Sequence, residues 1–216
     1  MHAAMKTEEK KMSNKRGIVI VISGPSGSGK GTVVKELRQI CPSMQVSVSA
    51  TTRQPRAGET DGVEYYFKTR EEFEGLIERG EVLEYTQYNG NYYGTLKSEA
   101  ERIISAGDDL ILEIEVDGGG QIKRLMGDEC VSVMLIAPSA AEQESRLRGR
   151  GTEAEDVIQG RLARAKAEIR EAVNYDYVVV NESGRQTECA ENILGIIKAE
   201  HFSTARMSSY IAEYFD

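Results

Sequence analysis

The chain has 216 residues and a formal net charge of −8 at pH 7. This acidic balance argues against broad binding to nucleic acid or to anionic membranes, because both need a basic surface. Cys41, Cys130 and Cys189 lie far apart and the chain has two histidines, so we expect free, largely buried thiols in a reducing cytosol and no structural zinc site.

Residues 1–16 are polar and contain no apolar signal core, and we expect a disordered leader there. No apolar run approaches the roughly 20 residues that span a bilayer. The sequence therefore predicts a cytoplasmic protein that does not associate with membranes.

The first structured elements are a strand and a helix. An apolar, β-branched run at residues 17–23 is followed at once by turn residues, which predicts a buried parallel strand that feeds a loop. A helix is expected over residues 30–40, with Val33, Val34 and Leu37 on one face.

Strands and helices then alternate along most of the chain. Apolar runs that predict buried strands lie at 110–116, 131–137 and 177–180, and helical patterns lie at about 118–126, 139–149, 155–173 and 187–200. We expect the last helix to extend to Tyr214, with apolar anchors at Ile196, Ile197, Phe202 and Tyr210. This alternation is typical of an α/β fold with a parallel β-sheet core flanked by helices.

Three segments depart from the alternation. Residues from about 49 to 96 are rich in Tyr, Thr, Arg, Glu and Gly and have short polar strands, so we interpret them as an inserted mixed α/β lobe in a core of 17–48 and 97–200. A charged, Gly-bearing stretch predicts a mobile lid at about 146–161. Residues 201–216 are expected to form a helical tail.

The segment Gly24-Pro25-Ser26-Gly27-Ser28-Gly29-Lys30 predicts a phosphate-binding loop, because it follows a strand and opens a helix. Its glycines allow close approach to phosphate, and its N–H groups can form an anion-binding hollow at the helix N-terminus. Lys30 can reach the β- and γ-phosphates, so the loop indicates an ATP site. Ser or Thr usually follows this lysine and contacts Mg²⁺; here Gly31 and Thr32 follow, so either Thr32 makes the contact or water fills the place.

Two acids stand near the end of the predicted strand at 110–116. The strand period places Glu113 and Glu115 on one face, where open α/β sheets bind ligands. We expect a role near Mg²⁺ or the acceptor nucleotide, the alternative being a solvent-facing edge.

Arginines form two further groups. Arg53 and Arg56 flank a turn, and guanidinium groups match phosphate oxygens in a bidentate way. Arg146 and Arg150 are four residues apart, and Arg161 and Arg164 lie in the next predicted helix. From spacing alone, the second group is either a charge clamp on a phosphoryl group or a solvated basic face.

Several separated motifs, in order, resemble guanylate kinase. They are the phosphate loop, Ser47-Val48-Ser49-x-Thr51-Thr52-Arg53-x-Pro55-Arg56-x-Gly58-Glu59, Gly90-Asn91-Tyr92-Tyr93-Gly94, Leu147-x-Gly149-Arg150-Gly151-Thr152 and Val180-Asn181. The resemblance covers about residues 17–200. It implies transfer of the γ-phosphoryl group of ATP to GMP. It also implies the fold of a nucleoside monophosphate kinase and Mg²⁺ as the cofactor.

The resemblance also implies roles for individual residues. The GMP phosphate would be held by Ser49, Arg53, Arg56, Tyr65 and Tyr93. Glu59 would orient Arg53 or Arg56, and Gly94, the last residue of the Gly90–Gly94 motif, would also belong to the GMP site. Glu84 and Thr95 would read the guanine edge. Arg146, Arg150 and Arg161 would be the lid arginines that meet the triphosphate, and Asn181 would lie beside the adenine.

The chain departs from the family pattern in two places. Glu113 and Glu115 stand where the family usually has Asp-x-Asp, and Asp117-Gly118 stands where Gln-Gly is common. Two other readings remain: a scaffold domain that binds phosphopeptides, which usually has a damaged phosphate loop, and a kinase for another nucleoside monophosphate. We expect ATP and GMP as partners, dGMP as a further acceptor, and homodimers through the C-terminal helix as a possibility.

Overall fold

The computed structural model describes residues 16–88, 90–149 and 155–215, so the expected leader lies almost entirely outside the described residues. The chain divides into two compact units. The first contains the chain up to Val19 and Ser43–Leu112, and the second contains Ile20–Pro42 and the chain from Glu113 onward. The three cysteines are free thiols, as expected.

The larger sheet has five strands in the order β2-β7-β1-β8-β9. They are β1 (Val19–Ser23), β2 (Gln45–Val46), β7 (Leu110–Glu113), β8 (Cys130–Ile136) and β9 (Tyr177–Val180). The pairs β2–β7 and β8–β9 are parallel. Every residue of β1 is buried, because a strand inside a parallel sheet is covered on both faces. The predicted α/β fold with a parallel core is confirmed.

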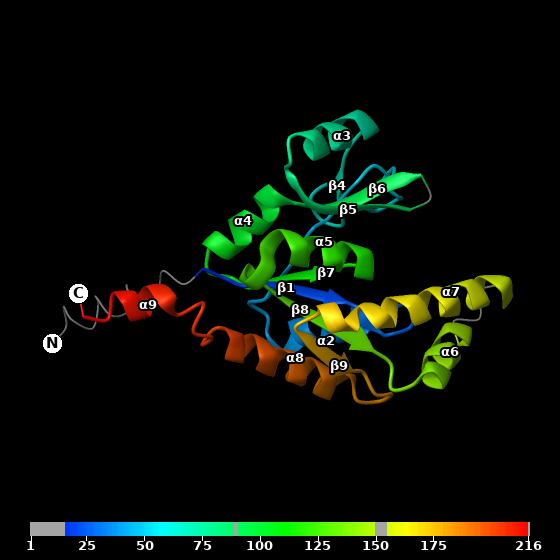
Figure 1. Ribbon diagram of the computed structural model, residues 1–216. Helices are drawn as coiled ribbons and strands as arrows, with labels where there is room; N and C mark the ends of the chain where they lie inside the picture. The colour runs from blue at the N-terminus through cyan, green and yellow to red at the C-terminus, as the bar shows by residue number, and fades with distance from the viewer. Residues whose placement is uncertain (1–15, 89, 150–154, 216) are drawn as a thin grey trace. The chain divides into compact units, whose positions relative to one another are not determined.

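Helices of the second unit cover β8 and β9. Helix α2 (Lys30–Ile40) buries the three apolar residues expected from its periodicity, and it packs against α8 (Gln186–Glu200). Helix α8 contacts β8 and β9, and α5 (Val116–Met126) packs against β8 from the other side (Figure 1). Strand β8 is therefore covered by α5 and α8 within this unit.

The remaining elements of the second unit follow the expected order with different ends. They are the 3₁₀ turn η1 (Gly127–Glu129), α6 (Ala140–Arg148), α7 (Glu155–Glu168), the 3₁₀ turn η2 (Ile169–Asn174) and α9 (Ser208–Ala212). The expectation of one C-terminal helix to Tyr214 is wrong, because α8 ends at Glu200 and α9 is a separate short helix. Phe202 and Tyr210 are exposed by 72% and 52%, so they do not anchor it.

The first unit contains a four-stranded sheet in the order β4-β3-β6-β5. Its elements are β3 (Ala50–Thr51), β4 (Tyr66–Phe67), α3 (Arg70–Glu78), β5 (Val82–Tyr88) and β6 (Asn91–Leu96), and α4 (Lys97–Ser105) follows. The rings of Phe73 and Tyr92 stack with centroids 5.1 Å apart and form a small core with Ala50. Thr69 and Glu72 form a capping box that fixes the start of α3.

A partly exposed ionic cluster joins α5 and β8 to the residue before β9 and predicts a pH-dependent contribution to stability. Asp176 accepts hydrogen bonds from Lys123 Nζ at 2.8 and 2.9 Å, from Ser132 N at 2.9 Å and from Ser132 Oγ at 2.7 Å. Burial acts to raise the pKa of Asp176, but the bonds from Lys123 and Ser132 outweigh it and lower that pKa. The stabilisation is therefore present above the unfolded pKa of about 3.9 and is lost as pH falls through the folded pKa.

We expect Asp176→Ala to lower the free energy of unfolding by about 2–3 kcal/mol at pH 7, because several bonds to one charged group are lost. Urea unfolding at pH 7 and at pH 3 measures the effect, which should shrink at the lower pH. Asp128→Ala is the matched control, since Asp128 is an exposed acid in η1. Equal losses for both variants would contradict the prediction.

Candidate active site

The phosphate loop connects β1 to α2 in the second unit. Gly27 has φ 87° and Gly29 has φ 90°, both in the left-handed region that favours glycine. A Cβ on Gly24 would lie 2.1 Å from the carbonyl oxygen of Leu135, so only glycine fits there. Gly29 is the N-cap of α2, which places the loop at a helix N-terminus, as an anion-binding hollow requires.

Lys30, the first residue of α2, folds back over the loop. Its Nζ donates a hydrogen bond to the carbonyl oxygen of Gly24 and lies 3.5 Å from Glu115 Oε1. The lysine side chain is only 12% exposed. The ammonium group is therefore held at the loop by the chain's own oxygens.

The positions of the two acids correct the predicted strand. Strand β7 ends at Glu113, and Glu115 is the N-cap of α5 with φ −70° and ψ 162°, so the acids do not share a strand face. The helix begins at Val116, which is buried in α5, and this ends the strand three residues before the expected point. Both acids are exposed, and Glu115 faces Lys30.

The pKa of the Glu113 carboxyl group is nevertheless raised by its surroundings. Partial desolvation raises the pKa of Glu113, attraction to Lys30 opposes this, and repulsion from Glu115 adds to it. A Cβ on Gly31 would lie 3.4 Å from Glu113 Oε1, so this carboxylate lies beside the position where a hydroxyl residue usually stands. Thr32 is exposed on the next position of α2.

The predicted arginines and Asn181 differ in how the structure places them. Arg161 on α7 lies with Nη1 3.4 Å from Ser26 Oγ, at the phosphate loop. Arg146 on α6 donates from Nη2 to the carbonyl oxygen of Asn181 at 2.8 Å. Asn181 is only 2% exposed and its Nδ2 donates to the carbonyl oxygen of Ser28 at 2.8 Å. Arg150 lies outside the described residues, as do Gly151 and Thr152.

A second group of predicted residues gathers in the first unit around Arg53. Its Nη2 donates to Glu59 Oε1 at 2.9 Å, and Glu59 Oε2 accepts from the backbone N–H of Arg56 at 2.7 Å. The bond to Arg53 is the main cause that lowers the pKa of Glu59. The Arg53 guanidinium lies 5.3 Å from the ring centroid of Tyr65, whose ring meets that of Tyr93 edge-on at 6.1 Å. The arrangement is a basic, tyrosine-lined cluster that can bind a phosphate group.

Glu84 is a buried carboxylate on β5 in the same unit. It is 5% exposed and accepts a hydrogen bond from Thr95 Oγ1 at 2.9 Å across the β5–β6 pair. Burial raises the pKa of Glu84, and the hydrogen bonds from Thr95 oppose that rise. A Cβ on Gly94 would lie 2.5 Å from the Glu84 carbonyl oxygen, so glycine is needed there. Ser49 is half-buried, and its carbonyl oxygen accepts from Tyr66 N at 2.9 Å.

The sequence did not single out two residues that contact this machinery, Glu142 and Ser183. Both bind Arg146: Glu142 Oε1 lies 3.0 Å from Nε, and Ser183 Oγ lies 3.0 Å from Nη2. The spacing of Glu142 and Arg146, four residues apart on a helix, was the available signal for the first. No local pattern marks Ser183, because its contact depends on the loop after β9.

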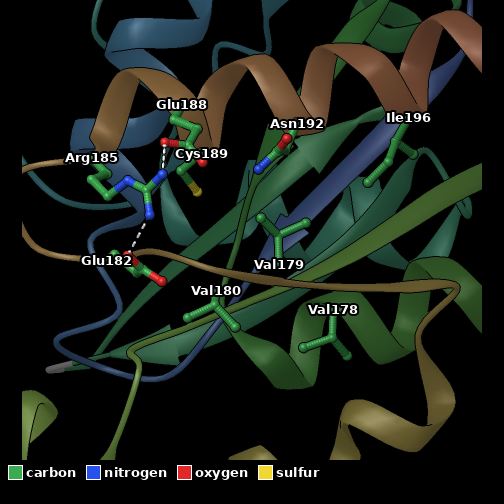
Figure 2. Close-up of a pocket in the computed structure, with 9 residues that line it drawn as sticks. All are labelled: Val178, Val179, Val180, Glu182, Arg185, Glu188, Cys189, Asn192 and Ile196. Atoms are coloured by element: carbon green, nitrogen blue, oxygen red, sulfur yellow. Dashed lines mark hydrogen bonds and ion pairs between the residues drawn. The ribbon is translucent and has the colours of Figure 1, made fainter.

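A hollow of about 480 Å³ lies between β9 and α8 in the second unit. Figure 2 shows Val179 of β9 pointing toward α8, while its neighbours Val178 and Val180 point away from that helix, and Arg185 is paired to Glu182 and Glu188 at one end. Burial raises the pKa of the Cys189 thiol to about 11, which disfavours its reactive thiolate. None of the residues predicted for either nucleotide lines this hollow.

A parallel α/β sheet with a phosphate-binding loop and clustered arginines defines a kinase of the phosphate-binding-loop class. A family model described as guanylate kinase matches residues 16–194. With most of its length matched, the chain belongs to the guanylate kinase family, and it is a phosphotransferase. The family predicted from the motifs is thereby confirmed, in preference to a scaffold domain or a kinase for another nucleotide.

Individual relatives agree with the family. A guanylate kinase of Halalkalibacterium halodurans is 48% identical over 91% of this chain and 95% of the relative. One from Clostridioides difficile is 44% identical over 93% of this chain and 97% of the relative. The crystal structure of guanylate kinase from Anaplasma phagocytophilum has a TM-score of 0.69 and 34% identity, covering 90% of this chain and 92% of that one. Among the described residues, none of the helices has the length and apolar character needed to cross a membrane.

Proposed function

We propose that this guanylate kinase transfers the γ-phosphoryl group of Mg²⁺-bound ATP to GMP, giving ADP and GDP, and that it also accepts dGMP. The observation that carries the choice of acceptor is the buried Glu84–Thr95 pair in the unit that also contains the Arg53 cluster. The cytoplasm and purine nucleotide metabolism are the setting that this reaction implies.

Glu84 is proposed to read guanine. Guanine presents its N1–H and N2–H₂ donors on one edge, and an ionised carboxylate is an acceptor for both. Thr95 donates its one hydroxyl proton to Glu84 and so holds one oxygen of that carboxylate in place. Adenine lacks these donors and would leave a buried carboxylate unpaired, which a site of this kind rejects strongly.

The phosphate of GMP is proposed to bind at the Arg53 cluster. Arg53 and Arg56 supply guanidinium donors, and the bond to Glu59 fixes the orientation of Arg53. Tyr65 and Tyr93 add phenol hydroxyls, while Ser49 and Gly94 complete the set expected from the motifs.

ATP is proposed to bind the phosphate loop of the second unit. Backbone N–H groups of the loop, to which Pro25 contributes none, and the Lys30 ammonium group would bind its phosphates, and Arg161 would add positive charge near Ser26. Arg146, and Arg150 from outside the described residues, would bind the triphosphate as well. No covalent intermediate is required, because charge stabilisation and alignment of the two substrates supply most of the rate.

The residues present fit a role for Mg²⁺, which when bound neutralises charge on the β- and γ-phosphates. The described residues contain no preformed group of three or more acidic, His or Cys ligands. Mg²⁺ at kinase sites usually keeps several waters and uses one or two carboxylates with substrate phosphates. Exposed Glu113, Glu115 and the Thr32 hydroxyl supply such oxygens near Lys30.

The domain layout is likewise a proposal. Residues of about 49–96 would form the GMP-binding lobe, 17–48 and 97–200 the core, about 146–161 the lid and 201–216 the tail. Closure of lobe and lid on the substrates would exclude water and limit hydrolysis of ATP. The exposed rings of Tyr210 and Tyr214 would be the contacts of a homodimer, which sedimentation of the protein tests.

A coupled assay of ADP release over a panel of nucleoside monophosphates tests the function. We expect turnover with GMP and dGMP that exceeds turnover with AMP by about 10⁴-fold or more, and loss of turnover when EDTA replaces Mg²⁺. Equal rates with GMP and AMP would end the guanine proposal, and full activity in EDTA would end the metal proposal.

The raised pKa of Glu84 predicts that GMP binding depends on pH. The donors of guanine favour the ionised carboxylate, so bound GMP should lower a pKa that burial raises in the free enzyme. GMP affinity should therefore fall as pH falls through the raised pKa, and binding in that range should release a proton. Calorimetry in two buffers of different ionisation enthalpy measures this proton.

The phosphate of GMP also titrates near neutral pH, so a control is needed. Glu84→Gln retains the phosphate contribution and removes the carboxylate, and the difference between the two proteins isolates Glu84. If both proteins released the same number of protons, Glu84 would not be the group that binds the guanine donors.

A further inference from the structure

Arg146 is the centre of a closed ring of contacts between α6 and the loop after β9. Its Nε donates to Glu142 Oε1 at 3.0 Å, and its Nη2 donates to the Asn181 carbonyl oxygen at 2.8 Å and to Ser183 Oγ at 3.0 Å. The Ser183 hydroxyl in turn donates to the carboxylate of Glu142. All of these residues belong to the second unit.

The ring is joined to the phosphate loop through one buried residue. Asn181 Nδ2 donates to the Ser28 carbonyl oxygen at 2.8 Å, and its backbone N–H donates to Ile136 O at 2.9 Å at the end of β8. A Cβ on Gly29 would lie 2.4 Å from Asn181 Nδ2, which shows how closely the amide is seated against the loop. A continuous series of contacts thus leads from Glu142 through Arg146 and Asn181 to Ser28.

The donor inventory of Arg146 shows what remains for a ligand. A guanidinium group has five N–H donors, one on Nε and two on each terminal nitrogen. Nε and both Nη2 protons have protein acceptors. Within the described part of the chain, the two Nη1 protons have none. Arg146 is therefore fixed by three donors and presents one nitrogen.

We propose that Glu142 and Ser183 are positioning residues that fix Arg146 against the Asn181 carbonyl, so that its Nη1 edge meets ATP in one preset orientation. This inference rests on the proposed role of Arg146 in binding ATP. A guanidinium group held before the ligand arrives loses less conformational entropy on binding, and the gain appears as affinity for ATP. The Arg146 and Glu142 side chains are 19% and 34% exposed, so their pair is more shielded than an ordinary surface pair.

The same helix provides a matched control. Glu144 pairs with Arg148 at 2.8 Å with the same spacing of four residues, but both side chains are about 40% exposed and neither contacts the phosphate loop. Glu144→Ala therefore removes a comparable helical ion pair without touching Arg146. Comparison with Glu142→Ala separates positioning of Arg146 from general stabilisation of α6.

The test measures the dissociation constant of ADP by calorimetry, KM for ATP, KM for GMP, kcat and Tm. Glu142→Ala should weaken ADP binding and raise KM for ATP by about 10-fold, and Ser183→Ala by about 3-fold, as expected for bonds of these kinds. KM for GMP and Tm should stay near the values of Glu144→Ala. Glu142→Gln should restore much of the affinity, because its amide oxygen still accepts from Nε.

A double mutant decides whether the effect passes through Arg146. Glu142→Ala should add little to Arg146→Ala, since the residue it positions is already gone. An unchanged ADP affinity in Glu142→Ala and Ser183→Ala, or an undiminished effect of Glu142→Ala without Arg146, would overturn the inference alone. An unchanged ADP affinity in Arg146→Ala would instead overturn the proposed role of Arg146 in ATP binding.

Discussion

Replacing Lys30 by alanine should lower kcat for GDP formation by about 10²–10³-fold or more, which is the scale seen when one preorganised charge-stabilising group is removed from a transition state. The side chain is only 12% exposed, and Nζ is held at the Gly24 carbonyl and near Glu115. No second cation in the described phosphate loop can take its place, because the loop's other residues from 24 to 32 carry no charge.

Lys35→Ala is the matched control for this variant. Lys35 is exposed on the same helix, so its loss changes the net charge by the same amount without changing the loop. Coupled assays give kcat and KM, and thermal unfolding checks that α2 is still formed. If Lys30→Ala retained most of the activity of Lys35→Ala, the phosphate loop would have been assigned wrongly.

The phosphate loop was the part of the site most readily predicted from sequence, because its information is local. A buried strand, a glycine-rich turn and a helix follow one another within residues 17–40, and both the strand and the helix are found there. The two glycines with positive φ lie inside the predicted motif. A contact that depends on successive residues of one segment can be inferred from the order of those residues alone.

Element ends were less predictable, because the apolar pattern continues through them. Apolar residues continue on both sides of Glu113 and Glu115 as far as Val116, yet the strand stops at Glu113 and Val116 already belongs to α5. Whether an apolar residue is the last of a strand or the first of a helix depends on which surface buries it, and periodicity does not distinguish these cases over seven residues. The positions of Glu113 and Glu115 changed for this reason.

Contacts between distant segments were not predictable from spacing. Arg146 lies on α6, while two of its partners, Asn181 and Ser183, come from the loop after β9. Asn181 was expected beside the adenine, and the structure shows its amide against Ser28. Such contacts depend on how the β8–β9 pair brings its loops together, which no stretch of sequence states by itself.

The role of Glu84 in the site was predicted only from the resemblance to guanylate kinase, because a single acid in a short polar strand has no distinctive local pattern. The structure adds the physical reason to examine it: a carboxylate 5% exposed, with its one described side-chain partner a threonine hydroxyl rather than a cation. Burial of a charge without a cation is costly, and the raised pKa of Glu84 expresses that cost. A ligand that supplies donors would relieve it.

Glu84→Gln should therefore separate activity from stability. The amide keeps the shape of the side chain but replaces one acceptor oxygen by an NH₂ donor, which would face the N1–H and N2–H₂ donors of guanine. We expect kcat/KM for GMP to fall by about 10²–10⁴-fold, which is below the full discrimination of sites built on buried hydrogen bonds because one acceptor remains. KM for ATP should change little, since the phosphate loop lies in the other unit.

The stability of Glu84→Gln should not fall with its activity toward GMP. A carboxyl group whose folded pKa is raised contributes stability at low pH and loses it as pH rises through that pKa, so the ionised Glu84 destabilises the free enzyme at neutral pH. Glutamine carries no charge to bury, and Tm of Glu84→Gln at pH 8 should equal or exceed that of the parent. Glu81→Gln, at an exposed residue just before β5 that pairs with Arg79 at 3.0 Å, is the control for charge alone. A variant that lost both GMP activity and stability would show that Glu84 is a structural residue, whereas lost activity with retained stability is the expected signature of a carboxylate kept buried for its ligand.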